Sequence, residues 1–280
     1  MHVENLILVF IAGFVTALAT GLGAIPFFFV EDFSDRWNVA LWGIASGIMV
    51  SASVFGLVDE GLVYSEGGIP TLMIGGLITG IVLVEVSDRV LDSIDVSGDS
   101  DASDHDAPVE ATAFAEGDPT KLLLILGILT VHSFPEGVAV GVSFAELGLD
   151  GGIPIFGFVV PLLAVFMTIA ISIHNIPEGT AIAIPMRALG LSKWRMVGAA
   201  IFSSLPQPIG AVIAFVFVTW AREFLPFGFG FAAGAMVYLV LTEFIPEALE
   251  TGADLPGKGR RELLIGISAG VAAMVPLGFI

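Results

Sequence analysis

Residues 132–137 read His-Ser-Phe-Pro-Glu-Gly, and residues 174–179 read His-Asn-Ile-Pro-Glu-Gly. In each copy a His and a Glu stand four residues apart, which places both side chains on one face of a helix. Both copies lie inside long apolar segments, where an ionisable group is unfavourable by about 2.5–3.5 kcal/mol on membrane-insertion scales. Two such copies need a compensating partner, and a divalent cation is the partner that these residue types favour.

The proline before each glutamate adds a second signal. A Pro inside a helix lacks the backbone N–H and clashes with the carbonyl four residues earlier, so Pro135 and Pro177 predict a kink in each segment. A kink frees a backbone carbonyl at the level of the His and the Glu. The two motifs therefore predict a pair of kinked helices that face each other around a cation.

The composition independently indicates a membrane protein. The 280 residues are 56% hydrophobic and only 14% charged, and the mean hydropathy is +0.95, whereas soluble domains carry about 25% charged residues. Long unbroken apolar runs favour helices over a closed barrel. The chain has no Cys, which excludes a disulfide framework, a thiolate metal site and a cysteine nucleophile. We predict an all-α integral membrane protein.

Apolar segments of about 17–25 residues are long enough to cross a bilayer, and eight segments qualify. They are residues 5–30, 37–58, about 67–90, about 120–146, 153–186, 196–221, about 224–248 and 263–280. The first motif lies in the fourth segment and the second motif in the fifth. The predicted fold is a bundle of eight transmembrane helices in which the kinked fourth and fifth helices form the metal site.

The ten basic residues predict the orientation. With the N-terminus outside, nine of them fall in cytoplasmic loops and only Arg222 falls outside, as the positive-inside rule requires. The nine are Arg36, Arg89, Lys121, Arg187, Lys193, Arg195, Lys258, Arg260 and Arg261. We expect a multi-pass protein of the cell membrane with both termini extracytoplasmic.

One acidic stretch interrupts the apolar pattern and divides the chain into 1–91 with helices one to three, 92–119 as a cytoplasmic loop, and 120–280 with helices four to eight. The loop is rich in Asp and Glu and is predicted to be disordered. It is either a solvated linker or, because it holds His105, a weak metal-collecting segment. The net charge of −18 and the pI of about 4.3 are typical of halophilic prokaryotes, whose acidic surfaces stay soluble at high salt.

The paired motifs resemble the fourth and fifth transmembrane helices of the ZIP (Zrt/Irt-like) family of metal transporters. The resemblance covers essentially the whole chain. Residues 203–211, Ser-Ser-Leu-Pro-Gln-Pro-Ile-Gly-Ala, resemble the sixth helix of that family, and residues 242–248, Thr-Glu-Phe-Ile-Pro-Glu-Ala, resemble its seventh helix.

The resemblance implies a cation site between helices four and five. Carried over by position, the primary ligands are His132 and Glu136 facing His174 and Glu178, and Met49 of the second helix matches a position that lends a thioether in some relatives. Imidazole and carboxylate ligands suit Zn²⁺, Fe²⁺ and Mn²⁺ alike. We expect Zn²⁺ as the substrate, with Fe²⁺, Mn²⁺, Cd²⁺ and Co²⁺ as further candidates that the ligand types do not rank. The metal is the transported substrate, and we expect no separate cofactor.

The chain departs from the family at a second metal position that many members build beside the first. Those positions hold Ser133, Asn175 and Gln207 here, and all three are neutral. Each is either a ligand or a hydrogen-bonding group between helices. We therefore expect one dominant cation site and a second site that is weak or transient.

Two other function classes fit a buried His and Glu set. An intramembrane zinc-dependent hydrolase would need a catalytic base, but the chain has no His-Glu-x-x-His run. A metal-binding membrane sensor would hold the ion without moving it. The resemblance instead implies uptake into the cytoplasm by a carrier that is not an enzyme, in which helices 1, 4, 5 and 6 move against helices 2, 3, 7 and 8. Its partners would be the cation, the lipid bilayer and, in a homodimer, a second copy, but no nucleic acid.

Overall fold

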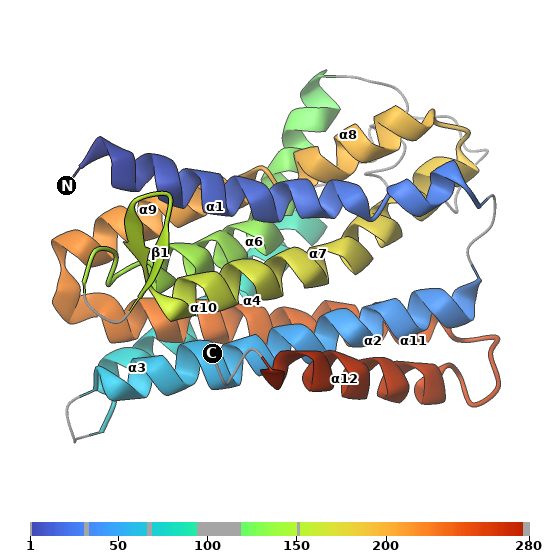
Figure 1. The fold of residues 1–280 in the computed structure, drawn as a ribbon. Helices are drawn as coiled ribbons and strands as arrows, with labels where there is room; N and C mark the ends of the chain where they lie inside the picture. Colours follow the sequence, from blue (N-terminus) through green and yellow to red (C-terminus); the bar gives the residue numbers. More distant parts are fainter. Residues whose placement is uncertain (1, 31–33, 66–68, 94–118, 150–151, 277–280) are drawn as a thin grey trace.

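The computed structural model describes residues 2–30, 34–65, 69–93, 119–149 and 152–276, and nearly all of these residues are helical (Figure 1). The α-helices are α1 (Val3–Leu22), α2 (Asp35–Ser51), α3 (Asp59–Val63), α4 (Thr71–Ser93), α6 (Pro119–Ser143), α7 (Leu162–Ala188), α8 (Lys193–Ser203), α9 (Pro206–Trp220), α10 (Leu225–Leu239), α11 (Ile245–Thr251) and α12 (Arg260–Met274). The shorter elements are the 3₁₀ helices η1 (Ile25–Phe28) and η3 (Arg222–Phe224), the π-helices η2 (Ala52–Val58) and η4 (Val240–Phe244), and the strands β1 (Ile153–Ile155) and β2 (Phe158–Val160).

Several of these elements join end to end into rods long enough to cross a membrane. Among the described residues, six rods or single helices meet that condition by length and composition. They are Val3–Leu22, Asp35–Val63, Thr71–Val90, Leu162–Ala188, Lys193–Trp220 and Arg222–Thr251. The predicted count of eight spans adds α6, which has 25 residues, and α12, which has 15. The count of eight spans stays a prediction. The kink at each motif also stays a prediction, because Pro135 and Pro177 lie within helices that continue on both sides of them.

The fifth predicted span begins differently from the expectation. Residues 153–160 form an antiparallel hairpin in which Ile153 pairs with Val160, and α7 starts only at Leu162. The turn of the hairpin holds Phe156 and Gly157 at positive φ angles of 49° and 85°, the backbone geometry of a tight hairpin turn. The apolar character of this segment therefore belongs partly to a hairpin outside the helix. Much of the acidic stretch, residues 94–118, lies outside the described residues.

Glycines bring particular helix pairs into direct backbone contact. On α4, Gly76 and Gly80 lie against the backbone of Phe227 and Phe231 in α10, where any Cβ atom would overlap the main chain. The contact is reciprocal, because glycines of α10 meet the backbone of α4 in the same way. Small residues at such crossings allow close van der Waals packing, which is the main attraction between helices in an apolar solvent. The same arrangement joins three other helix pairs: α2 with α12 through Gly43, Gly47, Gly266 and Gly270; α6 with α9 through Gly137, Gly141 and Gly210; and α1 with α7 through Gly23 and Gly179.

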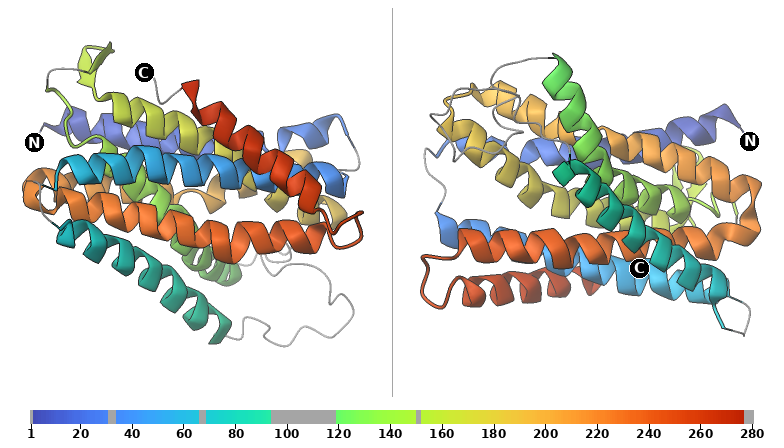
Figure 2. Two further views of the ribbon diagram at one scale, coloured as in Figure 1. Left: turned by 90° about the horizontal axis from the view of Figure 1, so that it is seen from below. Right: turned by 180° about the vertical axis from the view of Figure 1, so that it is seen from behind.

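These backbone contacts join α1, α6, α7 and α9 to one another and leave α2 with α12 and α4 with α10 as two further pairs. Together with the helices that pack beside them, they form two helix groups. The first group holds α1, α6, α7, α8 and α9, in the upper part of Figure 1, and the second holds α2, α3, α4, α10, α11 and α12 with the two π-helices. Figure 2 shows α12 beside α2 and α4 beside α10 within the second group. Among the described glycines, none meets the backbone of the other group. Gly56 and Gly228 approach it only through side chains such as Phe166 and Val142.

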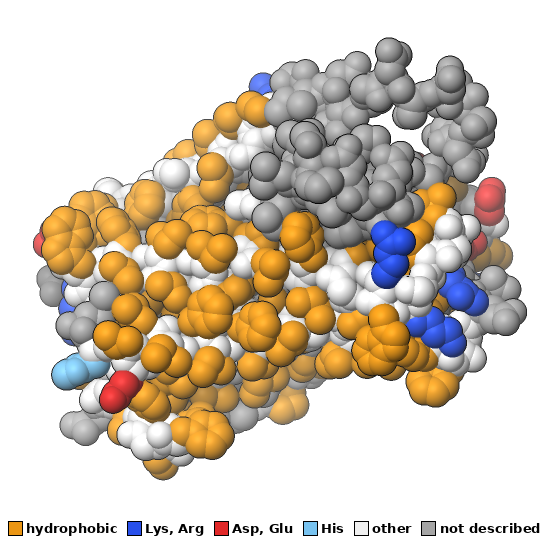
Figure 3. All heavy atoms as spheres, turned by 90° about the horizontal axis from the view of Figure 1, so that it is seen from above, with side chains coloured by type: hydrophobic (Ala, Val, Ile, Leu, Met, Phe, Trp, Pro, Cys, Tyr) orange, Lys and Arg blue, Asp and Glu red, His pale blue; other side chains and the backbone are white. Residues whose placement is uncertain are grey.

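The outer surface of the bundle is apolar along its middle. Hydrophobic side chains cover most of the visible face in Figure 3, and the charged side chains seen there lie mostly toward its ends. On α4, exposed Ile74, Ile78 and Val82 point away from the bundle. Inside, the core is filled largely by Ala, Val and Met side chains from both groups. The molecule is thus built to face lipid outside and to hold its polar groups within.

The close helix crossings generate a test with a control on the neighbouring residue. Gly76→Ala places a methyl group against the backbone of Phe227, whereas nothing lies within 4 Å of a Cβ atom at Gly75. We expect Gly76→Ala to destabilise the detergent-solubilised protein by about 1–3 kcal/mol, as overpacking does. Thermal unfolding should show a lower melting temperature for Gly76→Ala than for the parent, and no decrease for Gly75→Ala. Equal melting temperatures would mean that the α4–α10 crossing is not tight.

Candidate metal centre

A buried cluster of one imidazole and two carboxylates lies between α6 and α7. Glu136 comes from α6, and His174 and Glu178 come from α7; one ligand atom from each lies within 4.8 Å of the others. The His174 Nε2 atom is 3.1 Å from the Glu136 Oε1 atom. Glu136 and His174 are essentially inaccessible to solvent. The Glu178 Oε2 atom is also buried and has no hydrogen-bond partner among the described residues.

The local sequence explains how these side chains meet. His174 and Glu178 stand one helical turn apart on the same face of α7. Gly179 lies against the backbone of Thr20 in α1, and Gly137 against the backbone of Gln207 in α9. Each glycine directly follows a glutamate of the cluster, so the neighbouring helices fix both glutamates by backbone contact.

The cluster has the chemistry of a divalent cation site. Two carboxylates this close repel each other when both are ionised, and the apolar surroundings offer no bulk water to screen them. One divalent cation would neutralise both charges and satisfy the unpaired Glu178 oxygen. Imidazole nitrogen and carboxylate oxygen in a compact set suit Zn²⁺ and its first-row neighbours.

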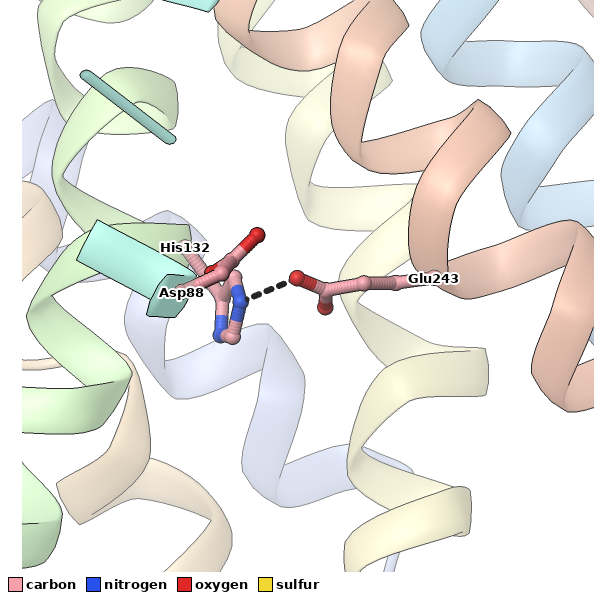
Figure 4. A group of neighbouring side chains, drawn as sticks. All are labelled: Asp88, His132 and Glu243. Atoms are coloured by element: carbon pink, nitrogen blue, oxygen red, sulfur yellow. Dashed lines mark hydrogen bonds and ion pairs between the residues drawn. The ribbon is translucent and has the colours of Figure 1, made fainter. Parts of the chain in front are cut away.

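A second, half-buried cluster lies nearby and bridges the two helix groups. Asp88 of α4, His132 of α6 and Glu243 of η4 bring their ligand atoms within 4.8 Å of one another (Figure 4). The His132 Nε2 atom is 2.6 Å from the Glu243 Oε1 atom. His132 belongs to the first helix group, while Asp88 and Glu243 belong to the second.

The two clusters are linked through α6. His132 and Glu136 stand four residues apart, so about one helical turn, roughly 6 Å, separates them along the axis. Glu178 of the buried cluster interacts electrostatically with both His132 and Glu243. A cation at one cluster would therefore be sensed at the other.

The structure brings together three of the four predicted primary ligands: Glu136, His174 and Glu178. His132 pairs with Glu243 of η4 instead and forms a separate cluster with it and Asp88 of α4. Met49 is fully buried in the main hydrophobic core. The predicted ligand set as a whole stays a prediction.

The three neutral residues beside the motif form hydrogen bonds within the first helix group. The Ser133 hydroxyl donates to the carbonyl of Ser203 at 3.1 Å. The Asn175 amide donates to the carbonyl of Thr16 at 2.8 Å and to Gln207 Oε1 at 3.1 Å. The Gln207 amide in turn donates to Glu136 Oε2. All three side chains are buried.

Sequence reasoning did not identify Asp88 and Thr16 as members of these arrangements, and it noted Glu243 only within the segment that resembles the seventh helix of the ZIP family. Asp88 and Glu243 carried a usable signal, since each is an acidic residue within a predicted span. Thr16 lies in the charge-free stretch of residues 5–30, where a hydroxyl gives no sequence signal of its own.

Comparison with known proteins gives consistent results. The family model described as ZIP Zinc transporter matches residues 82–278. A protein of Arabidopsis thaliana that is named provisionally as a zinc transporter is 38% identical over 84% of this chain, which spans only 33% of that longer protein. The zinc transporter ZIPB of Bordetella bronchiseptica is 31% identical over 98% of this chain and 81% of its own length. The zinc transporter GufA of Myxococcus xanthus is 29% identical, over 86% of this chain and 89% of its own.

The geometry predicts that Glu178 dominates cation binding at the buried cluster. Glu178→Gln keeps the shape and removes one charge, and a unit charge about 4 Å from an ion matters by about 4 kcal/mol per ion charge at an effective dielectric of 20. Calorimetric titration of the detergent-solubilised protein should show Zn²⁺ affinity reduced at least about tenfold. Glu250→Gln on the exposed face of α11 is the control and should bind like the parent. Matching affinities for both variants would place the cation elsewhere.

Proposed function

Because the chain belongs to the ZIP zinc transporter family, we propose that it carries Zn²⁺ into the cytoplasm through the buried cluster of Glu136, His174 and Glu178. The chain is a multi-pass membrane protein whose transported substrate is a divalent metal cation, and the named relatives are transporters and not enzymes. Zinc as the main substrate, the direction of transport and the site itself form the proposal. The hydrolase interpretation is set aside.

One observation carries the proposal most directly: two carboxylates and an imidazole meet inside an apolar bundle. A structural role would be served better by apolar side chains, because buried charge is destabilising unless it is compensated. A site that binds a cation and then releases it needs such ligands at membrane depth, where transporter sites usually lie. Fe²⁺, Mn²⁺, Cd²⁺ and Co²⁺ share this ligand chemistry and are secondary candidates.

The half-buried cluster supplies a second position for the same ion. It lies one helical turn away along α6 and combines His132 with Asp88 and Glu243. It is more exposed than the buried cluster, since the side chains of His132 and Glu243 are 23% and 32% accessible. We place it on the path between the buried cluster and the cytoplasm, where partial hydration favours release.

The division of the bundle supports a carrier with two moving parts. The first helix group contains every member of the buried cluster, and its helices α1, α6, α7 and α9 are held together by backbone contact at glycines. The second group contributes Asp88 and Glu243 to the half-buried cluster. Because the groups meet through side chains and not through glycine crossings, the first group can slide against the second with its ion. Small sliding motions of packed helices are a recognised mode of domain movement.

A second polar contact joins the two helix groups, at the end of the bundle away from the half-buried cluster. The Tyr64 hydroxyl, just after α3, donates to the Glu146 carboxylate, which follows α6. Burial, followed by the hydrogen bond to Glu146, raises the pKa of Tyr64. The phenol therefore stays protonated at neutral pH and keeps donating. In the proposed carrier this contact closes the extracytoplasmic side in the conformation described.

The direction of transport follows from the proposed orientation. Positive residues concentrate in the loops that would be cytoplasmic, with Arg222 as the exception. This orientation places the connection between α1 and α2 inside and the hairpin of β1 and β2 outside. The half-buried cluster then lies on the cytoplasmic side of the buried cluster, as uptake requires.

Transport itself is the direct test. The purified protein is reconstituted into liposomes that contain a metal-sensitive dye, and Zn²⁺, Fe²⁺, Mn²⁺, Cd²⁺ and Co²⁺ are added in turn. We expect Zn²⁺ uptake that is lost in Glu136→Ala and in Glu178→Ala, because one carboxylate leaves a dication incompletely neutralised in a low dielectric. Binding without uptake would support a sensor, and near-parental transport by both variants would contradict the proposed site.

The Asp88→Asn variant tests the release of Zn²⁺ separately from its binding. The change removes a charge from the half-buried cluster and leaves the buried cluster intact, so we expect Zn²⁺ affinity within about twofold of the parent and a transport rate reduced at least about fivefold, because ion transfer requires both positions. Asp59→Asn at the exposed start of α3 is the control. If Asp88→Asn transports at the parental rate, the half-buried cluster is not on the path.

A further inference from the structure

A chain of buried polar groups leads from α1 through α7 and α9 to Glu136. The Thr16 carbonyl accepts a hydrogen bond from the Asn175 amide at 2.8 Å, and the same amide donates to Gln207 Oε1 at 3.1 Å. The Thr16 hydroxyl is 2.6 Å from Gln207 Oε1. The Gln207 amide nitrogen then donates to Glu136 Oε2. Each of these four residues is at most 1% exposed.

The polarity of this chain follows from its first member. A backbone carbonyl only accepts hydrogen bonds, so Asn175 must turn its NH₂ group toward Thr16. The second hydrogen of that NH₂ group needs an acceptor, which fixes the oxygen of Gln207 on the side of Asn175. The NH₂ group of Gln207 is therefore turned toward Glu136. The orientation of both amides is set by one carbonyl of α1.

The distance from Gln207 to Glu136 is fixed as well. Gly137, the residue after Glu136, lies against the backbone of Gln207, and a Cβ atom at that position would overlap it. On the opposite side of α9, Pro208 is in equally close contact with Gly13 of α1. Gln207 thus stands at a point where α9 is held by two neighbouring helices, and its side chain has little freedom to move away.

We infer that Gln207 is a positioning residue that occupies Glu136 Oε2 with a neutral donor, so that the buried cluster takes a single divalent cation. The Gln207 oxygen already accepts from Asn175 and is turned away from the carboxylate. Glu136 is left with Oε1, the atom that lies beside His174. This inference rests on the proposed cation site and specifies how many cations that site binds.

The charge of the buried cluster matches the binding of a single divalent cation. With neutral imidazole, ionised Glu136 and Glu178 carry two negative charges, which one dication cancels. A second dication beside Oε2 would meet the N–H groups of Gln207 and would leave two uncompensated positive charges at low dielectric. A carboxylate at position 207 would remove the N–H groups and cancel one of the two uncompensated charges.

The test counts zinc ions in the full-length protein. Parent, Gln207→Glu and Gln207→Leu are dialysed against Zn²⁺ in detergent, bound metal is measured by elemental analysis, and affinity is measured by calorimetry. We expect Gln207→Glu to bind one more Zn²⁺ per chain than the parent. Gln207→Leu should keep the parental stoichiometry and bind about tenfold more weakly, as loss of a charge-assisted hydrogen bond predicts.

A double variant separates positioning from general stability. Thr16→Val keeps the backbone carbonyl and removes the hydroxyl that lies beside both Gln207 Oε1 and the Gly13 carbonyl. It should weaken Zn²⁺ binding in the parent and have no further effect in Gln207→Leu, because the hydroxyl reaches the buried cluster through Gln207. Ser143→Ala, which removes a buried hydroxyl bonded within α6, controls for loss of stability. Melting temperatures of all variants are recorded alongside the binding data.

The outcomes distinguish this inference from the proposed function. Parental affinity in Gln207→Leu, or unchanged stoichiometry in Gln207→Glu, would overturn the role of Gln207 and leave the site intact. Unchanged Zn²⁺ binding in Glu178→Gln would overturn the site itself. Affinity losses in Thr16→Val and Gln207→Leu that simply add would also contradict the inference, since independent effects add and coupled ones do not.

Discussion

Two carboxylates held within 4.8 Å of each other in an apolar interior are the constraint on which the other features depend. Such a pair is unfavourable without a cation, so the bundle must hold it together by other means when no ion is bound. Backbone contacts at Gly137 and Gly179 hold the two carboxylates in place, because each contact fixes the helix directly beside a glutamate. The Gln207 amide stabilises the Glu136 carboxylate by donating a hydrogen bond to it. The glycines and the neutral polar residues thus serve the same arrangement as the charged ligands.

The two clusters differ in how they relate to the helix groups. The buried cluster draws only on α6 and α7, and its geometry is preserved if one group moves as a body. The half-buried cluster is made of His132 from one group and of Asp88 and Glu243 from the other, so relative motion necessarily breaks or forms it. A binding position that moves intact and a transfer position assembled between the parts are the complementary requirements of a carrier.

Much of this arrangement could be predicted from the sequence. The doubled motif indicated which residues would lie at membrane depth, and three of its four ionisable residues meet in one cluster. The partner of His132 could not be predicted, since a period of four residues fixes the face of α6 but not the neighbour that α6 meets at each turn. Thr16 also gave no signal, because its contribution is partly a backbone carbonyl that every residue possesses. The hairpin before α7 was signalled by Pro154, Gly157 and Pro161, but its apolar composition read as part of a span.

The π-helix η4 restricts the kinds of change that this chain tolerates. A π turn holds one residue more than an α turn, and Glu243 lies within it. The π turn absorbs its extra residue locally, so α10 and α11 keep nearly the rotational relation of an uninterrupted helix. Gain or loss of one residue in the regular α-helical part of α10 has no such outlet and would rotate Glu243 by about 100° about the axis. Glu243 would then turn away from His132 although no ligand had been substituted. In this segment the length of the chain is as much a determinant of the metal path as the identity of its residues, so related sequences should vary here by substitution and not by insertion or deletion.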